Sequence, residues 1–152
     1  MWLILEDDLE RMDAFQEVAN MYSPPQELKV WRIASCMIEK LTVFLDHATV
    51  ISLDHDLYRY WDGDPEPGTG RDVANYLATL APVCPIIIHS ANTNAAWGMY
   101  NELTHAKWRV KLIHHSDEPQ WIQKRWVSLV RELTTDEISN LSSNTDALKC
   151  TD

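Results

Sequence analysis

Short apolar runs alternate with amphipathic stretches along most of the chain. The apolar runs have the length of buried strands, and the stretches between them carry apolar residues at helical spacing, so the pattern predicts alternating strands and helices. The predicted strands are residues 2–5, 27–33, 49–54, 85–90 and 108–113. The predicted helices are residues 8–22, 34–45, 70–81, 93–106 and 118–133.

Local signals support these boundaries. Pro24 and Pro25 break the first helix, and Thr69 with Asp72 three residues later predicts a capping-box start for the third. Five strand–helix units in strict alternation, with Ile-, Leu- and Val-rich strands, predict a parallel sheet covered by helices on both faces. Right-handed crossovers then favour a doubly wound, five-stranded α/β fold of three layers, flavodoxin-like in arrangement.

The predicted domain comprises residues 1–133, and residues 134–152 form a polar C-terminal tail with room for one short helix. The 152-residue length suits one domain with a full core. No apolar run approaches the roughly 20 residues of a membrane span. The strand-like start without basic residues predicts no signal peptide. The unpatterned cysteines indicate reduced thiols, so we expect a cytoplasmic protein.

The chain has a net charge of −10, which argues against a DNA duplex as partner because such binding needs a basic face. A small nucleotide stays compatible if a metal cation offsets the acids at its site. Trp121 and Trp126, at helical positions, favour helix packing or a dimer face over ligand contact. The oligomeric state is left open, a homodimer included.

Ionisable and polar side chains follow four of the five predicted strands. Ligands bind beyond the carboxyl ends of the strands in such sheets, so these groups are expected to form one site. The groups are Glu6, Asp7 and Asp8; Asp54, His55 and Asp56; His89, Ser90 and Asn92; and His114, His115, Ser116 and Asp117. Each group alone also fits a plain helix start, because acids and Asn favour that position.

Carboxylates from neighbouring strands repel each other unless a cation lies between them. An oxygen-rich set of Glu6, Asp7 and Asp54, with Asp56 as a further ligand, suits Mg²⁺ or Mn²⁺. His55 as a ligand would shift the preference towards Mn, Fe or Zn. The alternative is that His55 orients a ligand or lies in a solvated turn.

These motifs resemble the receiver domain of two-component signalling. The acidic pair after the first strand matches Glu6 and Asp7, the aspartate after the third strand matches Asp54, and the Ser-Ala after the fourth begins at Ser90. The resemblance implies a Mg²⁺ site around a phosphorylatable aspartate. The receiver lysine that ends the fifth strand is missing, because His114 lies near that place.

The segments LDHDL (53–57) and HSAN (89–92) resemble a divergent group, the cyclic-phosphate-processing receiver domains. That resemblance implies a metal-dependent phosphoesterase acting on cyclic phosphates of nucleotides or RNA ends. In this reading His55 is the general base or a metal ligand, and His89 or His114 is the general acid, because imidazole titrates near neutral pH.

Further polar groups are expected to contact the phosphate. Ser90 and Asn92 would donate hydrogen bonds, with Asn92 as a helix N-cap in the alternative reading. Gly70 and Arg71, at a helix start facing the site, would cradle phosphate oxygens. Two other functions remain: a module that captures a nucleotide without turnover, and a regulatory receiver phosphorylated on Asp54.

Overall fold

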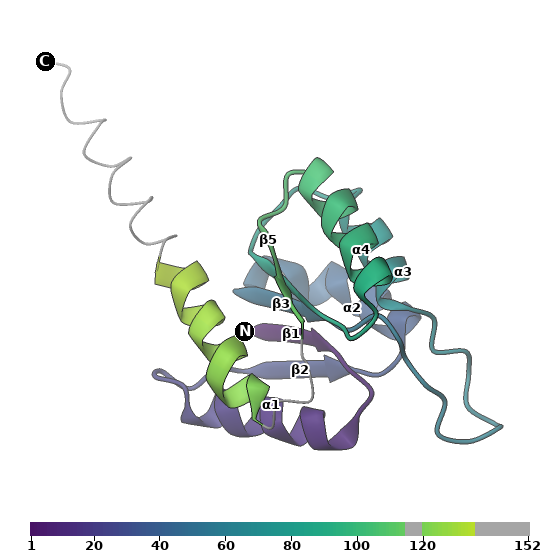
Figure 1. Ribbon diagram of the computed structural model, residues 1–152, viewed down its shortest axis with the longest axis horizontal. Helices are drawn as coiled ribbons and strands as arrows, with labels where there is room; N and C mark the ends of the chain where they lie inside the picture. Colours follow the sequence, from purple (N-terminus) through teal and green to yellow (C-terminus); the bar gives the residue numbers. More distant parts are fainter. Residues whose placement is uncertain (115–119, 136–152) are drawn as a thin grey trace, which may run out of the picture.

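The computed structural model describes residues 1–114 and 120–135. Its centre is a five-stranded parallel sheet with strand order β2-β1-β3-β4-β5 (Figure 1). The strands are β1 (Trp2–Leu5), β2 (Leu28–Trp31), β3 (Val50–Leu53), β4 (Ile86–His89) and β5 (Val110–Ile113). The chain moves outward from β1 to β2 and then returns to the other side of β1. This order confirms the doubly wound sheet and places its switch point between β1 and β3.

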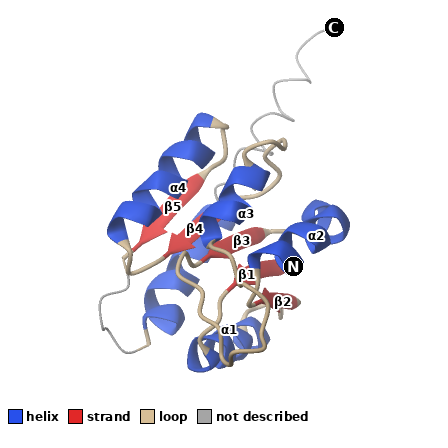
Figure 2. Cartoon of the chain, turned by 90° about the vertical axis from the view of Figure 1, so that its right-hand side faces the viewer, coloured by secondary structure: helices blue, strands red, loops and turns tan. Residues whose placement is uncertain are grey.

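Helices cover both faces of the sheet (Figure 2). They are α1 (Leu9–Met21), α2 (Ala34–Phe44) with a 3₁₀ turn at Leu45–His47, α3 (Gly70–Leu77), α4 (Thr93–His105) and a last helix at 121–135. Within the last helix, Ile122–Trp126 has π-helical hydrogen bonding. The helices α2, α3 and α4 lie on one face, and α1 and the last helix lie on the other.

The alternation of side chains along each strand divides the core in two. In β1, Leu3 and Leu5 point to α2, α3 and α4, whereas Trp2 and Ile4 point to α1 and the last helix. Every residue of β1, β3 and β4 is buried. Burial on both faces explains why these strands carry unbroken apolar runs rather than alternating ones.

The predicted elements are present, with shorter strands and shifted helix ends. Asp72 Oδ2 accepts from the Thr69 N–H at 2.7 Å, which confirms the capping box. The helix α3 ends at Leu77, four residues before the predicted 81. It stops there because the N–H groups of Thr79 and Leu80 bond three residues back, at 3.0 and 2.9 Å, and tighten the chain into a turn.

The last helix runs to 135, two residues beyond the predicted domain boundary. Its predicted start at 118 and the tail from 136 lie outside the described residues. Trp121 and Trp126 are 7% and 0% exposed, so both pack inward as helix-packing residues and neither offers a dimer face. Among the described residues, no helix has the length and apolar character needed to cross a membrane.

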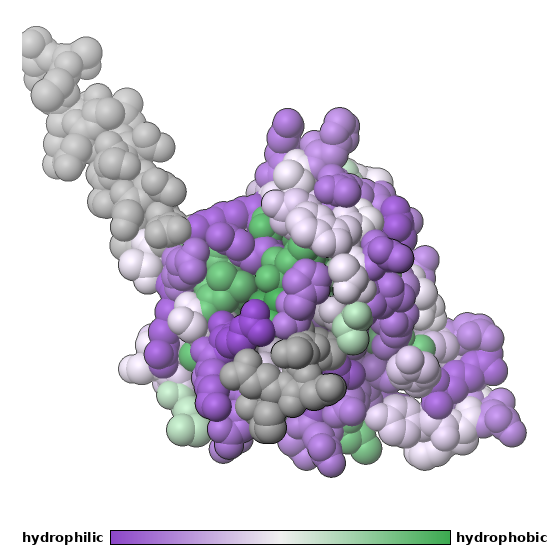
Figure 3. Space-filling view, viewed as in Figure 1, coloured by the Kyte–Doolittle hydropathy of each residue, from purple (hydrophilic) through white to green (hydrophobic). Residues whose placement is uncertain are grey.

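The surface in the view of Figure 3 is largely hydrophilic, except for a hollow beside β5. This hollow lies between β5 and the last helix, and Leu112, Ile113 and Leu129 supply its apolar lining. The strand β5 is the edge of the sheet on this side, so its outer flank is covered by no further strand in the described chain.

Candidate functional site

Three neighbouring strands bring acidic and imidazole groups to one edge of the sheet. Glu6 follows β1, Asp54 follows β3 and His89 ends β4. Backbone hydrogen bonds hold the first two in register, because the Asp54 N–H donates to the Leu5 carbonyl at 3.0 Å. One ligand atom from each of Glu6, Asp54 and His89 lies within 4.8 Å of the others. The structure therefore brings these three residues from separate strand ends together.

Side chains alternate between the two faces of the sheet along each strand, and this alternation, or parity, decides which groups meet on the same face. Glu6 continues the alternation of Trp2 and Ile4, so it points to the face of α1 and the last helix. Asp54 and His89 have the same parity as Val50 and Ile87, which line that face. Ser52 lies between Val50 and Asp54 in this alternation. We call Glu6, Arg11, Ser52, Asp54 and His89 the inner cluster.

A buried hydrogen-bond chain runs through the inner cluster. The Trp126 indole Nε1–H donates to Ser52 Oγ at 2.9 Å, and Ser52 Oγ lies 2.7 Å from His89 Nδ1. His89 Nε2 lies 3.2 Å from Glu6 Oε2. The Glu6 carboxylate can only accept, so the imidazole proton is assigned to Nε2; Nδ1 of that tautomer accepts from the Ser52 hydroxyl, whose oxygen accepts from the indole. This assignment pairs every donor in the chain.

Arg11, from the first turns of α1, supplies a cation between two acids. Its Nη2 lies 3.2 Å from Glu6 Oε1 and 3.4 Å from Asp54 Oδ2. Asp8 positions this helix, because its Oδ1 accepts from the Arg11 backbone N–H at 2.9 Å as the N-cap. The guanidinium therefore offsets the repulsion between carboxylates that the sequence predicts for this edge.

Burial and neighbouring charges move the carboxylate pKa values in different directions. Burial raises the pKa of Asp54, and the charge of Glu6 adds to the rise. Burial also raises the pKa of Asp7. Burial acts in the same direction on Glu6, but the hydrogen bond from His89 and the charge of Arg11 outweigh it and hold the pKa of Glu6 below its usual value.

Asp7 connects the long loop between β3 and α3 (residues 54–69) to the acidic edge, the sheet edge where Glu6, Asp7 and Asp54 follow their strands. Its Oδ2 accepts from the Tyr58 N–H at 2.9 Å, and its carbonyl accepts from the Tyr60 hydroxyl. Its Oδ1 is buried and has no hydrogen-bond partner among the described residues. Leaving a buried carboxylate oxygen unpaired is costly, so this atom suits a cation.

His55, Asp56 and Asn92 form an outer cluster at the rim. His55 Nδ1 lies 2.7 Å from Asp56 Oδ1, and Asn92 Nδ2 donates to the same oxygen at 3.4 Å. The His55 side chain is 15% exposed and that of Asp56 is 43% exposed. Since His55 follows Asp54 directly, the outer cluster adjoins the inner one. Asn92 Oδ1 also accepts from Ala95 N–H at 3.1 Å, so its predicted N-cap role is confirmed.

Ser90 is buried beside the outer cluster, where its Oγ accepts from the Asn92 N–H at 3.2 Å. Gly70 lies against the site for a reason of packing: a Cβ there would lie 1.9 Å from the Asp54 carbonyl oxygen. Gly70 N–H donates to the His55 carbonyl at 3.0 Å, so it is engaged with the chain itself. The glycine thus brings the start of α3 close to the end of β3.

Two predicted site residues point elsewhere. Arg71 lies 3.8 Å from Glu102 Oε2 and packs over Gly98 of α4, which turns it away from the strand ends. His114 is exposed, and no described contact joins its imidazole to either cluster. The parity of the sheet explains this, because Ile113 pairs with His89 and shares its face.

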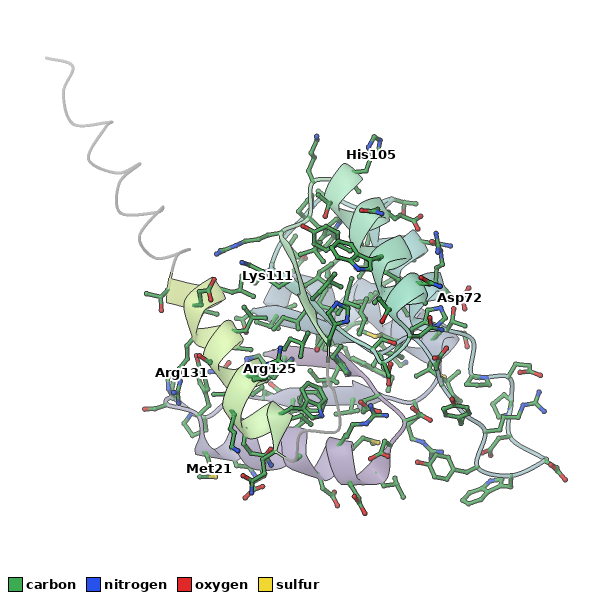
Figure 4. The ribbon with its side chains drawn as sticks, in the orientation of Figure 1. Met21, Asp72, His105, Lys111, Arg125 and Arg131 are labelled. Atoms are coloured by element: carbon green, nitrogen blue, oxygen red, sulfur yellow. The ribbon has the colours of Figure 1, made fainter. Side chains whose placement is uncertain are left out.

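Basic residues at the β5 end have structural partners. The Lys111 side chain of β5 points towards the last helix (Figure 4). Its Nζ lies 3.5 Å from Glu132 Oε1 of that helix. Arg125 of the last helix donates to the His114 carbonyl at 3.1 Å. Figure 4 also shows His105 at the C-terminal end of α4, away from Asp72 at the start of α3. Lys111 therefore does not take the place of the receiver lysine.

The residues present fit a divalent cation. Glu6 and Asp54 offer oxygen ligands within reach of each other, and the buried Oδ1 of Asp7 lacks another partner among the described residues. Such oxygen sets are preferred by Mg²⁺ and Mn²⁺. Asp56, predicted as a further ligand, is engaged by His55 and Asn92 in the outer cluster.

Sequence reasoning missed Ser52, Arg11 and Trp126. Ser52 is a polar residue inside the apolar run VISL at an inward position, and a buried hydroxyl needs a partner. That requirement was a usable signal. Arg11 and Trp126 gave no comparable signal, because an arginine on a helix and a tryptophan in an apolar stripe are ordinary residues there.

The fold defines a class of protein. The chain is similar to the response regulator domain of Thermotoga maritima CheB, with a TM-score of 0.62, 13% identity, and coverage of 88% of this chain and 95% of that one. It is similar to a response regulator receiver domain from Rhodospirillum rubrum, with a TM-score of 0.60, 13% identity, and coverage of 91% and 94%. The fold is that of a receiver domain.

The Mn²⁺-bound form of response regulator Rcp1 is similar at a TM-score of 0.57 and 15% identity, with coverage of 90% of each chain. No curated protein matches the sequence. The family model of the cyclic-phosphate processing receiver domain matches residues 2–105. The chain belongs to this family. The match includes β1 to β4 with both clusters and ends before β5.

Proposed function

We propose that this protein binds a divalent cation and hydrolyses the cyclic phosphate of a small nucleotide or an RNA end. The observation that carries the proposal is the adjacency of the two clusters. The inner cluster offers acids to a cation, and the outer cluster offers a histidine with one ring nitrogen held by a carboxylate. Membership of a family described by cyclic-phosphate processing supports the substrate class.

Glu6, Asp7 and Asp54 would hold the ion, Mg²⁺ or Mn²⁺ by their oxygen chemistry. When bound, such an ion supplies Lewis-acid chemistry that offsets charge on the phosphoryl group. Arg11, which bridges Glu6 and Asp54 at 3.2 and 3.4 Å, would turn its guanidinium to phosphate oxygens. A planar guanidinium suits this contact.

His55 would act as the general base. Asp56 Oδ1, 2.7 Å from Nδ1, places the proton on that nitrogen and leaves the lone pair on Nε2. The Nε2 atom accepts a proton from the attacking water as its oxygen bonds to phosphorus. One ester P–O bond breaks, and the departing oxygen takes a proton to become a hydroxyl. The product is a phosphate monoester, and one water is consumed.

His89 has a different role from the one expected from the sequence. Both of its ring nitrogens are engaged and the side chain is 0% exposed, so it is a positioning residue for Glu6 rather than the general acid. His114 is exposed and lies away from both clusters, so it is not the acid; the proton that His55 Nε2 takes from the water would pass to the departing oxygen. Ser90 would donate a hydrogen bond from its hydroxyl to the phosphate. The hydroxyl proton is available for this, because in the contact with the Asn92 N–H the Ser90 Oγ is the acceptor.

The test is incubation with 2′,3′-cyclic nucleotides and Mn²⁺, with detection of phosphate monoesters. The wild type is expected to form product, Asp54→Asn to form none, and His55→Ala to lose about 10²–10⁴-fold in kcat. His105→Ala, at the far end of α4, is the matched control and should keep full activity. Nucleotide binding without any product would support capture instead of catalysis.

A regulatory receiver phosphorylated on Asp54 is the second candidate. Asp54 follows β3 beside Glu6, and the fold is that of signalling receivers. The engagement of Lys111 with Glu132 weighs against it, because receivers contact the phosphoryl group with a lysine at the end of the fifth strand, although Arg11 places a cation 3.4 Å from Asp54 Oδ2. Stable labelling of Asp54 by acetyl phosphate, absent in Asp54→Asn, would favour this function over hydrolysis.

A further inference from the structure

A cavity lies beside the acidic edge but outside both clusters. Its volume is about 190 Å³. It lies between the start of α2 and the long loop after β3, the segment that stands away from the body in Figure 1. Its lining consists of Arg32, Ile33, Tyr58, Arg59, Asp64 and two prolines of the loop. Neither Glu6, Asp54 nor His55 contributes to this lining, so the cavity needs a role of its own.

Asp7 connects the cavity to the site. Tyr58 lines the cavity while its backbone N–H donates to Asp7 Oδ2 at 2.9 Å. Tyr60 donates its hydroxyl to the Asp7 carbonyl, and its ring lies 3.8 Å from the Arg32 guanidinium carbon. A molecule whose phosphate contacts the acidic edge could therefore extend another part into the cavity.

Arg32 is prepared for a planar ligand. Its guanidinium stacks on the Tyr60 ring, which restricts its orientation. Its Nε is buried and has no hydrogen-bond partner among the described residues. The guanidinium has thus lost part of its hydration without gaining a hydrogen bond at that N–H. A ligand with acceptor atoms would supply the missing hydrogen bond.

The charges of the lining disfavour a second phosphate. Arg59 is ion-paired with Glu66, and Asp64 adds a carboxylate to the wall. The two arginines of the lining, with Asp64 in the wall and Glu66 paired to Arg59, leave the region close to neutral. The remaining walls, from Ile33, Pro65 and Pro67, are apolar. A neutral, flat heterocycle with donors and acceptors on its edge suits this environment better than an anion.

Guanine matches the polar groups best. Its O6 and N7 accept from a guanidinium, the pairing that arginine makes with this base elsewhere. Its N1–H and N2–H groups donate, and a carboxylate such as that of Asp64 only accepts. The Tyr60 N–H occupies Asp64 Oδ2 at 3.3 Å, which leaves Asp64 Oδ1 for a ligand. Uracil and cytosine lack this combination of acceptors and donors.

We propose that this cavity is the base subsite of the protein and prefers guanine, with Arg32 and Asp64 reading its edge. The inference rests on the proposed function for the presence of a nucleotide. It adds the identity of the base and the residues that select it. The loop after β3 then carries specificity, while the strand ends carry the reaction.

Direct binding tests the subsite apart from turnover. The affinities of guanosine, adenosine and uridine 2′-monophosphates are measured by calorimetry in Mg²⁺ buffer. The guanosine form is expected to bind at least 10-fold more tightly than the uridine form. Arg32→Leu and Asp64→Asn should reduce that ratio to near unity, and Arg32→Lys, which keeps the charge, should reduce it too because the planar fork is lost.

Lys40→Gln is the matched control, since Lys40 lies exposed on α2 beside Glu39 and lines no part of the cavity. It should keep the full ratio. Circular dichroism of each variant confirms that the fold is retained. Equal binding of the three nucleotides, or a ratio unchanged in both Arg32 variants, overturns the proposal.

The outcomes separate this inference from the proposed function. If the protein discriminates between bases but forms no product, the proposed hydrolysis is wrong and the proposed base subsite is supported. Hydrolysis of all cyclic nucleotides at equal kcat/KM would sink the subsite and keep hydrolysis. Asp54→Asn provides a further check, because it should lose turnover yet keep the ratio of guanosine to uridine affinities.

Discussion

His89 Nε2 lies 3.2 Å from Glu6 Oε2, and both side chains are 0% exposed. The histidine that ends β4 therefore serves the acid that follows β1, across the intervening β3. This contact orients Glu6 and helps keep it ionised. It assigns His89 to the framework of the acidic edge rather than to the surface where a substrate binds.

Removing the His89 ring should destabilise the protein. In His89→Ala, Glu6 loses its buried partner and a cavity forms beside Phe15 and Trp121, whose rings lie 5.4 and 5.6 Å from the imidazole centroid. The expected loss in the free energy of unfolding is about 3 kcal/mol or more. Urea denaturation measures it. His105→Ala should stay within about 0.5 kcal/mol, and a similar value for His89→Ala would contradict the buried contact.

Ser52→Ala should lower the free energy of unfolding by more than the small size of the removed hydroxyl suggests. The hydroxyl links the Trp126 indole to His89 at 2.9 and 2.7 Å, so its removal leaves two buried polar atoms unpaired. Each unpaired group costs about 1–3 kcal/mol. Chemical denaturation followed by circular dichroism would report the change. Thr79→Ala, which removes an exposed hydroxyl, is the control, and an equal effect at both positions would refute the chain of hydrogen bonds.

Asp54→Asn should raise the stability of the metal-free protein at pH 7. Burial raises the pKa of Asp54, so the folded protein disfavours its ionised form, and this penalty grows as pH rises from the unfolded pKa through the folded one. A neutral amide removes the penalty. The same variant should no longer gain stability from Mn²⁺, where the wild type gains about 2.7 kcal/mol at 100 times Kd. Thermal unfolding with and without Mn²⁺ tests both signs.

Metal affinity should rise with pH. The pKa values of Asp7 and Asp54 are raised by burial, and protons compete with the cation for both carboxylates. Glu6, whose pKa is lowered, is already ionised and contributes no slope above its usual pKa. Titration of free Mn²⁺ by electron paramagnetic resonance between pH 4.5 and pH 8 would measure the slope. A flat profile would indicate that these acids do not bind the ion.

Two glycine variants test the packing of α3 against the site. In Gly70→Ala the new Cβ would lie 1.9 Å from the Asp54 carbonyl oxygen, so the start of α3 and the end of β3 must separate. We expect a loss of about 3 kcal/mol and weaker Mn²⁺ binding. Gly63→Ala meets nothing within 4 Å and should be neutral or stabilising by about 0.4–1 kcal/mol. Calorimetric unfolding of the two variants gives the comparison.

The amino-acid sequence by itself determined the class of fold and the edge where the site lies. Unbroken apolar runs at regular intervals are compatible with little other than buried parallel strands, and the chain ends each strand at the same edge. The family motifs around Glu6, Asp54 and His89 could be recognised from the sequence, because each directly follows or ends a predicted strand. The local sequence pattern is enough to predict the fold when the spacing of apolar residues and the order of strands and helices are compatible with one architecture.

The tertiary structure decided which of these groups meet. Each strand offers polar residues of both parities, and only the register of neighbouring strands sets Glu6, Asp54 and His89 inside and leaves His114 exposed. The contacts of Arg11 and Trp126 join segments distant in the chain, so no local pattern encodes them. Side-chain packing across the sheet, a property of the folded whole, selects these partners.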